Sequence, residues 1–233
     1  MCTSIISNRN KTIVGWNLDL LGMEYRIHNH EKGVFIEILD KQQGWLPLFG
    51  ANTRKDFVGM PTCWPFDERS NPKEKEENIL LLDMDLLMQK KTLQEILTIV
   101  KKERICSIPN VTFMSSLSDC KGNVLQIIPG QGYKYYEKPV YQILTNFSPF
   151  KMNSETHPWM GWDRYNIAKN ILENASDDFD VNDCFDLLKK VSQQVCPTVV
   201  SMVLDADQGI VYWCENQKWD TIEKRILQKK LAY

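Results

Sequence analysis

The first residues of the chain combine two groups that can do chemistry together. The sequence begins Met-Cys-Thr. Methionine before a small residue is normally trimmed, which would make Cys2 the first residue of the mature chain. Its thiol has an ordinary pKa of about 8.5, and its α-amine one of about 7.7–8.0. Part of the amine is therefore unprotonated at neutral pH and can take the proton of the thiol. This pattern predicts a nucleophile that carries its own general base and needs no histidine.

The same position has a simpler interpretation. A cysteine at position two can be an inert side chain. If Met1 is retained, the amine is blocked and cannot act as a base. Cys2 alone does not decide between these interpretations, so the choice depends on the residues that follow it.

Several later segments complete a recognisable pattern, in order along nearly the whole chain. They are GWNLD at Gly15–Asp19, GANTRKDFVGMP at Gly50–Pro61, LTNFSPF at Leu144–Phe150, and GWDRYNIAKNI around Arg164. With the Met-Cys-Thr start, they resemble the N-terminal-nucleophile (Ntn) hydrolases. More closely, the chain resembles the group of choloylglycine hydrolases, penicillin V acylases and acid amidases. That group has a Gly-x-Asn-x-Asp strand end, a Leu-Thr-Asn-x-Pro-x-Phe segment and an Asp-Arg-Tyr helix start.

The resemblance implies a role for each of four residues. Cys2 is the nucleophile, with its α-amine as the base, and Asp19 orients the amine or the thiol. Asn146 offers its side-chain amide to the oxyanion, and Arg164 places a positive charge near the thiol, which favours thiolate. Without the resemblance, Asp19 reads as a turn-capping carboxylate, Asn146 as a turn residue and Arg164 as a solvated arginine at a helix start.

The chain departs from this family pattern at three places. Trp16 stands where bile salt hydrolases have an arginine. Met60 and Pro61 stand where the group has its second oxyanion asparagine, so a backbone N–H is expected to replace that donor. The charged segment 65–78 takes the place of a pocket-forming region and is either a solvated connection or an active-site flap. Conjugated bile salts are therefore not the expected substrates.

The resemblance implies one domain over residues 1–233, with the α+β, four-layer α-β-β-α sandwich of Ntn hydrolases. The implied activity is hydrolysis of a linear amide C–N bond in an N-acyl amine or amino acid, through a thioester on Cys2. The alternative is a catalytically silent relative that binds an acyl compound or a protein partner. The identities of the acyl group and of the amine stay open, as does the choice between hydrolysis and acyl transfer. Candidates for a partly apolar substrate pocket are Trp16, Met23, Phe57, Met60 and Trp64.

The elements that must position these residues are mainly strands. Strands alternate with turns over 2–63, 111–145 and from 198 to the end of the chain. A capping box at Thr92–Glu95 begins one helix, Arg164–Ala175 forms a second, and a third begins near Asp180. Since the strands do not alternate regularly with helices, we expect two antiparallel sheets with helices on their outer faces.

The composition limits the partners and the compartment. The net charge of −2 gives no basic footprint for nucleic acid. We find no apolar run of the roughly 20 residues that a membrane span needs and no signal peptide, so a cytoplasmic protein without membrane or nucleic-acid partners is expected. The expected partner is a small-molecule amide, with no metal or organic cofactor. The oligomeric state, including a homo-oligomer, stays open.

Seven cysteines and three histidines were considered as metal ligands. No two cysteines have CxxC spacing, so six of them are expected to be reduced, buried thiols. His28 and His30 alternate on a predicted strand and could bind a metal, but no acidic or thiol partner for them is expected. We therefore expect ordinary surface histidines there, and His157 has no suggestive context.

Overall fold

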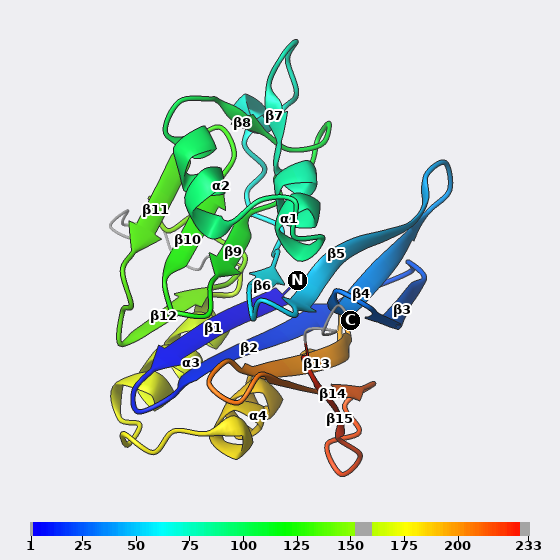
Figure 1. Cartoon of the computed structure of the whole chain (residues 1–233). Coiled ribbons are helices and arrows are strands. Elements are labelled where there is room, and N and C mark those ends of the chain that lie inside the picture. The colour runs from blue at the N-terminus through cyan, green and yellow to red at the C-terminus, as the bar shows by residue number, and fades with distance from the viewer. Residues whose placement is uncertain (1, 152–159, 229–233) are drawn as a thin grey trace, which may run out of the picture.

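The structure is a computed structural model that describes residues 2–151 and 160–228. Met1 and His157, both considered in the sequence analysis, lie outside these residues. In the described part of the chain, two antiparallel sheets lie face to face, and four helices lie outside them (Figure 1).

The first sheet joins the two ends of the chain. Its strand order is β12-β1-β2-β13-β14-β15, and each neighbouring pair is antiparallel. The N-terminal hairpin therefore lies beside β13, which comes from near the C-terminus (Figure 1). The strands are β1 (Cys2–Asn8), β2 (Thr12–Asp19), β12 (Tyr141–Leu144), β13 (Thr198–Asp205), β14 (Ile210–Glu215) and β15 (Glu223–Ile226).

The second sheet is built from the middle of the chain, in the order β11-β10-β9-β6-β5-β4-β3. Its strands are β3 (Tyr25–His30), β4 (Gly33–Asp40), β5 (Gly44–Asn52), β6 (Phe57–Gly59), β9 (Ser115–Ser118), β10 (Val124–Ile128) and β11 (Gly132–Tyr136). The predicted solvated segment 65–78 contains a short 3-10 helix, η1 (Glu68–Ser70), and a strand, β7 (Glu77–Asn78), that pairs in parallel with β8 (Ile105–Cys106).

The helices are α1 (Ile79–Leu87), α2 (Leu93–Val100), α3 (Trp162–Glu173) and α4 (Val181–Lys190). The predicted capping box of α2 is present, and Asp180 with Asp183 forms a second one at α4. Helix α1 is absent from the sequence analysis. Its sequence, ILLLDMDLL, is apolar at most positions, so the helical period that reveals an amphipathic helix is weak.

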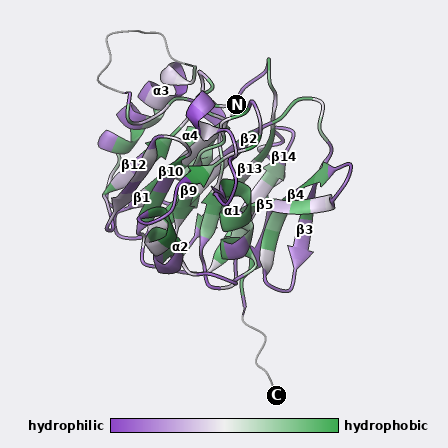
Figure 2. Cartoon of the chain, turned by 90° about the horizontal axis from the view of Figure 1, so that it is seen from above, coloured by the Kyte–Doolittle hydropathy of each residue, from purple (hydrophilic) through white to green (hydrophobic). Residues whose placement is uncertain are grey.

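Three layers of buried side chains show how the molecule is stacked. The central one lies between the sheets and includes Trp16 and Met202 from the first sheet and Ile36 and Phe57 from the second. A second layer joins α1 and α2 to the second sheet, and a third joins α3 and α4 to the first. Figure 2 shows the hydrophobic residues concentrated on these packed elements. The predicted α+β, four-layer α-β-β-α sandwich is confirmed.

The alternation of side chains along β1 sets the environment of the predicted site. Ile6 belongs to the core between the sheets, and Ile5 to the core beneath α3 and α4. Since side chains on a strand alternate between its faces, Cys2 shares the inter-sheet face with Ile6, and Thr3 shares the helix face with Ile5. The first two described residues of the chain therefore reach opposite sides of one sheet.

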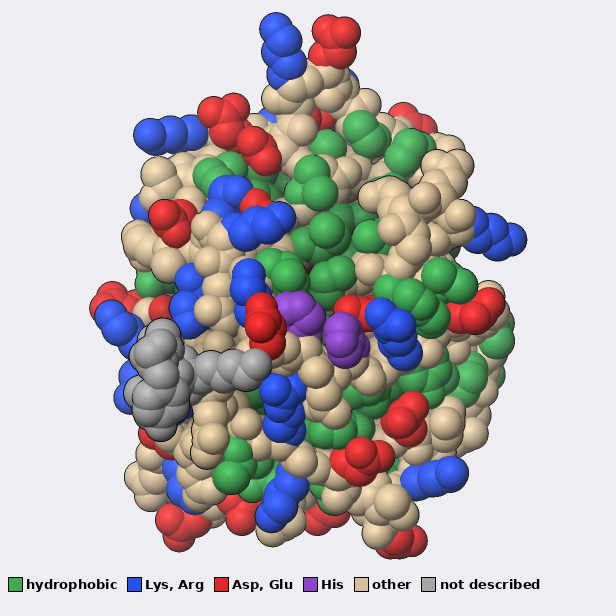
Figure 3. Space-filling view, turned by 45° about the vertical axis from the view of Figure 1, so that its right-hand side comes forward, with side chains coloured by type: hydrophobic (Ala, Val, Ile, Leu, Met, Phe, Trp, Pro, Cys, Tyr) green, Lys and Arg blue, Asp and Glu red, His purple; other side chains and the backbone are tan. Residues whose placement is uncertain are grey.

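The two described histidines lie on the surface, as predicted, in β3 (Figure 3). The expectation that these histidines have no acidic partner is wrong for His28. Glu37 of the adjacent strand β4 lies beside it, with 2.8 Å between Glu37 Oε1 and His28 Nδ1. Within residues 2–151 and 160–228, no group of His, Cys, Asp and Glu side chains could hold a metal ion. In the same part of the chain, no helix is long and apolar enough to cross a membrane.

Gly15 is required by the close packing of α4 on β2. A Cβ atom at this position would lie 2.6 Å from Cys184 Sγ and 2.9 Å from Ile5 Cγ1. Both neighbours are buried in the core under α4, so neither has open space into which it can move.

We predict that Gly15→Ala lowers the free energy of unfolding by about 1–3 kcal/mol, the usual cost of overpacking. Urea denaturation measures this directly. In a Cys184→Ala background the sulfur is absent, so the same glycine substitution should cost less. An equal cost in both backgrounds would contradict the proposed close contact.

Candidate active site

Strand register brings the predicted catalytic residues to one end of the first sheet. Cys2 begins β1 and pairs with Leu18 of β2, while Asp19 at the end of β2 pairs with Thr198 at the start of β13. Asn146 follows β12, which is the other neighbour of β1. Antiparallel pairing therefore gathers residues that are far apart in the sequence.

Cys2 is almost buried, with 5% of its surface exposed. Its backbone nitrogen donates a hydrogen bond of 2.9 Å to Asn146 Oδ1, and its Sγ lies 3.9 Å from the carbonyl oxygen of Asp19. Burial raises the pKa of the Cys2 thiol to about 12. The thiol is therefore protonated at neutral pH and needs a base that acts during attack.

The side chain of Asn146 connects Cys2 to the loop that contains Thr62. Its Oδ1 accepts hydrogen bonds from the Cys2 nitrogen and from Arg164 Nη2, at 2.6 Å. Its Nδ2 donates to the carbonyl oxygen of Thr62 at 2.7 Å and to Thr62 Oγ1 at 3.2 Å. Because one end faces two donors and the other faces a carbonyl, this network fixes the orientation of the amide.

Arg164 is a buried cation in the first turn of α3, with 2% of its surface exposed. Besides Asn146, its guanidinium donates to the carbonyl oxygen of Cys2 at 2.7 Å and to Thr3 Oγ1 at 2.8 Å. Gly161, with φ +80°, allows this approach, because a Cβ there would lie 2.8 Å from Arg164 Nη2. The arginine is thus a structural support for the first residue of β1.

Asp19 lies next to this network. Its Oδ1 accepts a hydrogen bond of 2.5 Å from the Thr198 hydroxyl, and its Oδ2 is 3.8 Å from Arg164 Nη1. Burial raises the pKa of Asp19 from its ordinary 3.8 to about 7, while the Thr198 hydroxyl and the Arg164 charge act in the opposite direction. The carboxyl therefore titrates near neutral pH.

The structure brings all four predicted catalytic residues together, and their chemical roles stay predictions. Sequence reasoning missed the threonines that complete the network, Thr3, Thr62 and Thr198. Thr3 follows Cys2 directly, and Thr62 follows Met60-Pro61, where the second oxyanion asparagine of the family pattern is missing. Nothing in the sequence singles out Thr198, because only strand pairing brings it to Asp19.

An apolar cavity of about 410 Å³ opens beside Cys2. Its wall comes from β2, β4, β5 and the loops around 60 and 110. The lining side chains are Cys2, Leu18, Asp19, Leu20, Leu21, Met23, Ile38, Leu48, Phe49, Met60, Thr62, Ile108, Val111, Phe113 and Cys196. No residue of segment 65–78 is among them, so the structure does not place that segment over the cavity as a flap.

The predicted pocket residues divide into two groups. Met23 and Met60 line the cavity. Trp16, Phe57 and Trp64 are not among its lining residues: Trp16 and Phe57 are fully buried in the core between the sheets, and Trp64 is 47% exposed. The Trp16 ring stacks on Phe49 with 5.5 Å between centroids, so it supports the cavity wall from behind.

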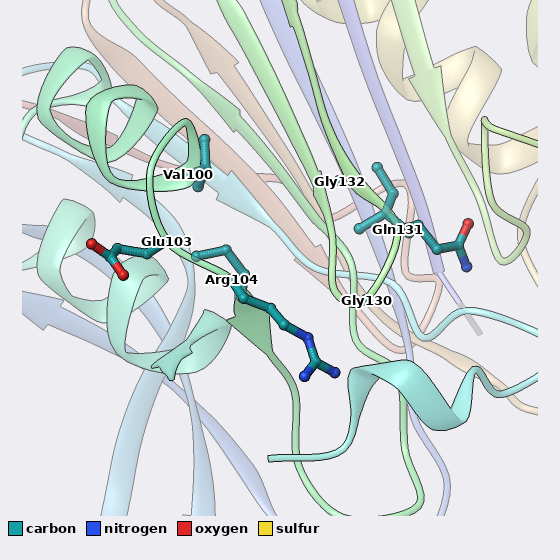
Figure 4. A pocket seen from close by; sticks show the side chains of 8 residues that line it. Val100, Glu103, Arg104, Gly130, Gln131 and Gly132 are labelled. Atoms are coloured by element: carbon teal, nitrogen blue, oxygen red, sulfur yellow. The ribbon is translucent and has the colours of Figure 1, made fainter. Parts of the chain in front are cut away.

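A second cavity, of about 220 Å³, lies between the end of α2 and the β10–β11 turn (Figure 4). Its polar rim includes Glu103, Arg104 and Gln131. Arg104 forms an ion pair of 2.5 Å with Glu76, and Gln131 donates to Asp67. None of the four predicted catalytic residues lines this cavity, so the cavity beside Cys2 is the candidate active site.

Comparison with known proteins supports the fold but not a sequence family. No protein-family model matches the chain, and no curated protein matches it. A mutant of conjugated bile acid hydrolase from Clostridium perfringens superposes with a TM-score of 0.69 at 14% identity, covering 99% of this chain and 94% of that one.

Two other solved structures have the same fold. Penicillin V acylase from Agrobacterium tumefaciens gives a TM-score of 0.64 at 12% identity, over 92% of this chain and 83% of that one. The Caenorhabditis elegans ortholog of N-acylethanolamine-hydrolyzing acid amidase gives 0.60 at 17% identity, over 88% and 93%. The chain therefore has the Ntn-hydrolase fold that its sequence resemblance implies.

The pKa of Asp19 leads to a prediction about stability. Between pH of about 4 and 7, the folded protein holds a proton that the unfolded chain has released, so the free energy of unfolding falls as pH rises. Asp19→Asn cannot titrate and lacks this contribution. Urea denaturation should show wild type losing stability relative to Asp19→Asn, by more than about 1 kcal/mol, from pH 4 to pH 8.

Asp67→Asn is the matched control. A hydrogen bond from Arg69 lowers the pKa of Asp67, so this carboxylate adds stability that is present at higher pH and lost in acid. Because the ordinary pKa of Asp67 is 3.8 and the folded one is lower, its difference from wild type should be nearly constant from pH 4 to pH 8 and should shrink only in stronger acid. If the Asp19→Asn difference were constant over the same range, Asp19 would not have a raised pKa.

Proposed function

We propose that this protein is an amidase that cleaves a linear C–N bond in an N-acyl amine or N-acyl amino acid, with Cys2 as the nucleophile. One observation carries the proposal. Asn146 Oδ1 accepts hydrogen bonds from the Cys2 nitrogen and from Arg164. Cys2 also lines an apolar cavity. These contacts support Cys2 as the nucleophile, its amine as the base, and the cavity as the place for an acyl group.

The reaction begins when removal of Met1 frees the α-amine of Cys2. The amine accepts the thiol proton as sulfur bonds to the amide carbonyl carbon, and the π electron pair moves onto the carbonyl oxygen. The C=O bond then re-forms, the C–N bond breaks, and the leaving amine takes the proton from the Cys2 ammonium. Water, activated by the same amine, hydrolyses the thioester. The buried thiol, with a pKa of about 12, makes this coupled proton transfer necessary.

The cavity favours an apolar acyl group. Most of its lining side chains are aliphatic or aromatic, and Asp19 is the one charged residue among them. An acyl chain bound there would remove apolar surface from water, and the amine part would extend toward solvent. The three similar structures are named as a conjugated bile acid hydrolase, a penicillin V acylase and an N-acylethanolamine-hydrolyzing amidase. Their names support amide hydrolysis as the general reaction.

We predict that Cys2→Ala abolishes hydrolysis of N-acyl amides, because no other group replaces the sulfur nucleophile. Cys214→Ala is the matched control. Cys214 is also buried, with a pKa raised by burial to about 11, but it lies in the core beneath the helices. The Cys214→Ala variant should retain amide hydrolysis in a spectrophotometric assay. Full turnover by Cys2→Ala would refute the assignment of the nucleophile. Loss of turnover with acyl binding retained would be expected.

The apolar wall also predicts a dependence on acyl length. In a series of straight-chain N-acyl amides with one common amine, kcat/KM should rise about fourfold for each added methylene, since each buried methylene is worth about 0.8 kcal/mol. The rise should end once the chain fills the cavity. An acyl chain of the same length that ends in a carboxylate is the control and should react poorly. A flat series, or faster cleavage of the carboxylate compounds, would contradict an apolar acyl site.

A further inference from the structure

The amide of Asn146, the oxyanion donor that the sequence suggests, is fully engaged within the protein. Its oxygen accepts from the Cys2 nitrogen and from Arg164. Its nitrogen, which has two hydrogens, donates to the carbonyl oxygen and the hydroxyl of Thr62. A developing oxyanion in the cavity would therefore have to displace one of these bonds or find another donor.

The Thr62 hydroxyl meets the requirements for that other donor. Thr62 lines the same cavity as Cys2, and none of the other described residues that line it carries a hydroxyl group. Because Thr62 Oγ1 accepts from Asn146 Nδ2 at 3.2 Å, its own hydrogen is available for another acceptor. Among the described residues, no hydrogen bond uses that hydrogen.

The position of Thr62 is fixed by the backbone around it. The carbonyl oxygen of Thr62 is held by Asn146 Nδ2, and the nitrogen of Trp64 donates to the Asn146 carbonyl oxygen at 2.7 Å. Thr62 also forms an antiparallel bridge with Phe113. A donor held in place before the reaction stabilises developing charge without reorganisation.

A charged group also polarises the hydroxyl through two hydrogen bonds. Arg164 donates to Asn146 Oδ1, and Asn146 Nδ2 donates to Thr62 Oγ1. In such a chain, each hydrogen bond strengthens the next. The positive charge of Arg164 thus acts on the Thr62 hydroxyl, although Arg164 itself does not line the cavity.

We propose that the Thr62 hydroxyl donates a hydrogen bond to the oxyanion of the tetrahedral intermediate, as a catalytic residue of this chain. The inference rests on the proposed amidase function. In this step the Cys2 sulfur bonds to the carbonyl carbon, the thiol proton goes to the Cys2 amine, and the negative carbonyl oxygen accepts the Thr62 O–H. Met60 and Pro61 stand where the family pattern has its second oxyanion asparagine, Pro61 has no N–H to offer, and Thr62 supplies a side-chain donor directly after them.

The first test compares Thr62→Val, which keeps the shape and removes the hydroxyl, with Thr62→Ser, which keeps the hydroxyl. On the p-nitroanilide of octanoic acid, Thr62→Val should lower kcat on the order of a hundredfold with little change in KM. Thr62→Ser should stay close to wild type. Thr145→Val is the matched control, because its buried hydroxyl has no hydrogen-bond partner among the described residues, and it should also stay close to wild type.

The second test does not need turnover. 1,1,1-Trifluoro-2-nonanone carrying ¹³C at its carbonyl carbon, a ketone that does not condense with the free Cys2 amine as an aldehyde would, should add to the Cys2 thiol as a hemithioketal, with the new C–S bond formed and the thiol proton transferred to the former carbonyl oxygen. NMR measures the adduct, and Thr62→Val should weaken it on the order of tenfold. Thermal unfolding verifies that each variant is folded.

The outcomes separate the two proposals. An active wild type whose kcat is unchanged in Thr62→Val, or falls equally in Thr62→Ser, overturns the role of Thr62 and leaves the amidase proposal standing. If wild type forms the adduct but does not cleave the anilide, the affinity for the adduct tests the role of Thr62. A weaker adduct in Thr62→Val supports Thr62 as the hydrogen-bond donor, and an equally strong adduct overturns that role. A wild type that does neither overturns both proposals.

Discussion

The site depends on one buried guanidinium. Arg164 is a permanent cation with 2% of its surface exposed, and burying such a charge is costly unless hydrogen bonds and an opposite charge satisfy it. The first residues of β1, the amide of Asn146 and the nearby carboxylate of Asp19 provide them. Helix α3, the N-terminal strand and the loop after β12 are thereby held together. Removing any one partner would leave a buried charge incompletely paired.

This constraint also explains the chemistry that the site favours. Burial raises the pKa of the Cys2 thiol, and the cavity beside it is mostly apolar, so surroundings that suit an acyl group disfavour a resting thiolate. In the proposed mechanism an adjacent amine resolves this conflict, because it accepts the proton only as sulfur attacks. Asn146 accepts a hydrogen bond from the Cys2 nitrogen, and two residues of the surrounding polar network, Asp19 and Thr62, line the cavity themselves.

The sequence revealed the parts of this arrangement that follow local rules. The resemblance to Ntn hydrolases pointed to Cys2, Asp19, Asn146 and Arg164, and turns, one capping box and helical periodicity located most strands and three of the four described helices. Helix α1 was missed because its apolar residues are nearly continuous. Trp16 and Phe57 were assigned to the pocket because residue type does not distinguish a core aromatic from a ligand-binding one. Thr62 and Thr198 were missed because their contacts span 84 and 179 residues and exist only after folding.

The central claim is that Cys2, with a free amine, forms a covalent acyl intermediate. Its most direct test is rapid acid quenching of wild-type protein mixed with octanoyl p-nitroanilide, followed by pepsin digestion in acid and mass spectrometry, since acid keeps the amine protonated and prevents migration of the acyl group from sulfur to nitrogen. The account predicts an N-terminal peptide that begins at Cys2, without Met1, and carries one octanoyl group on the Cys2 sulfur. An N-terminal peptide that retains Met1, or that stays unacylated throughout steady turnover of the anilide, would contradict it.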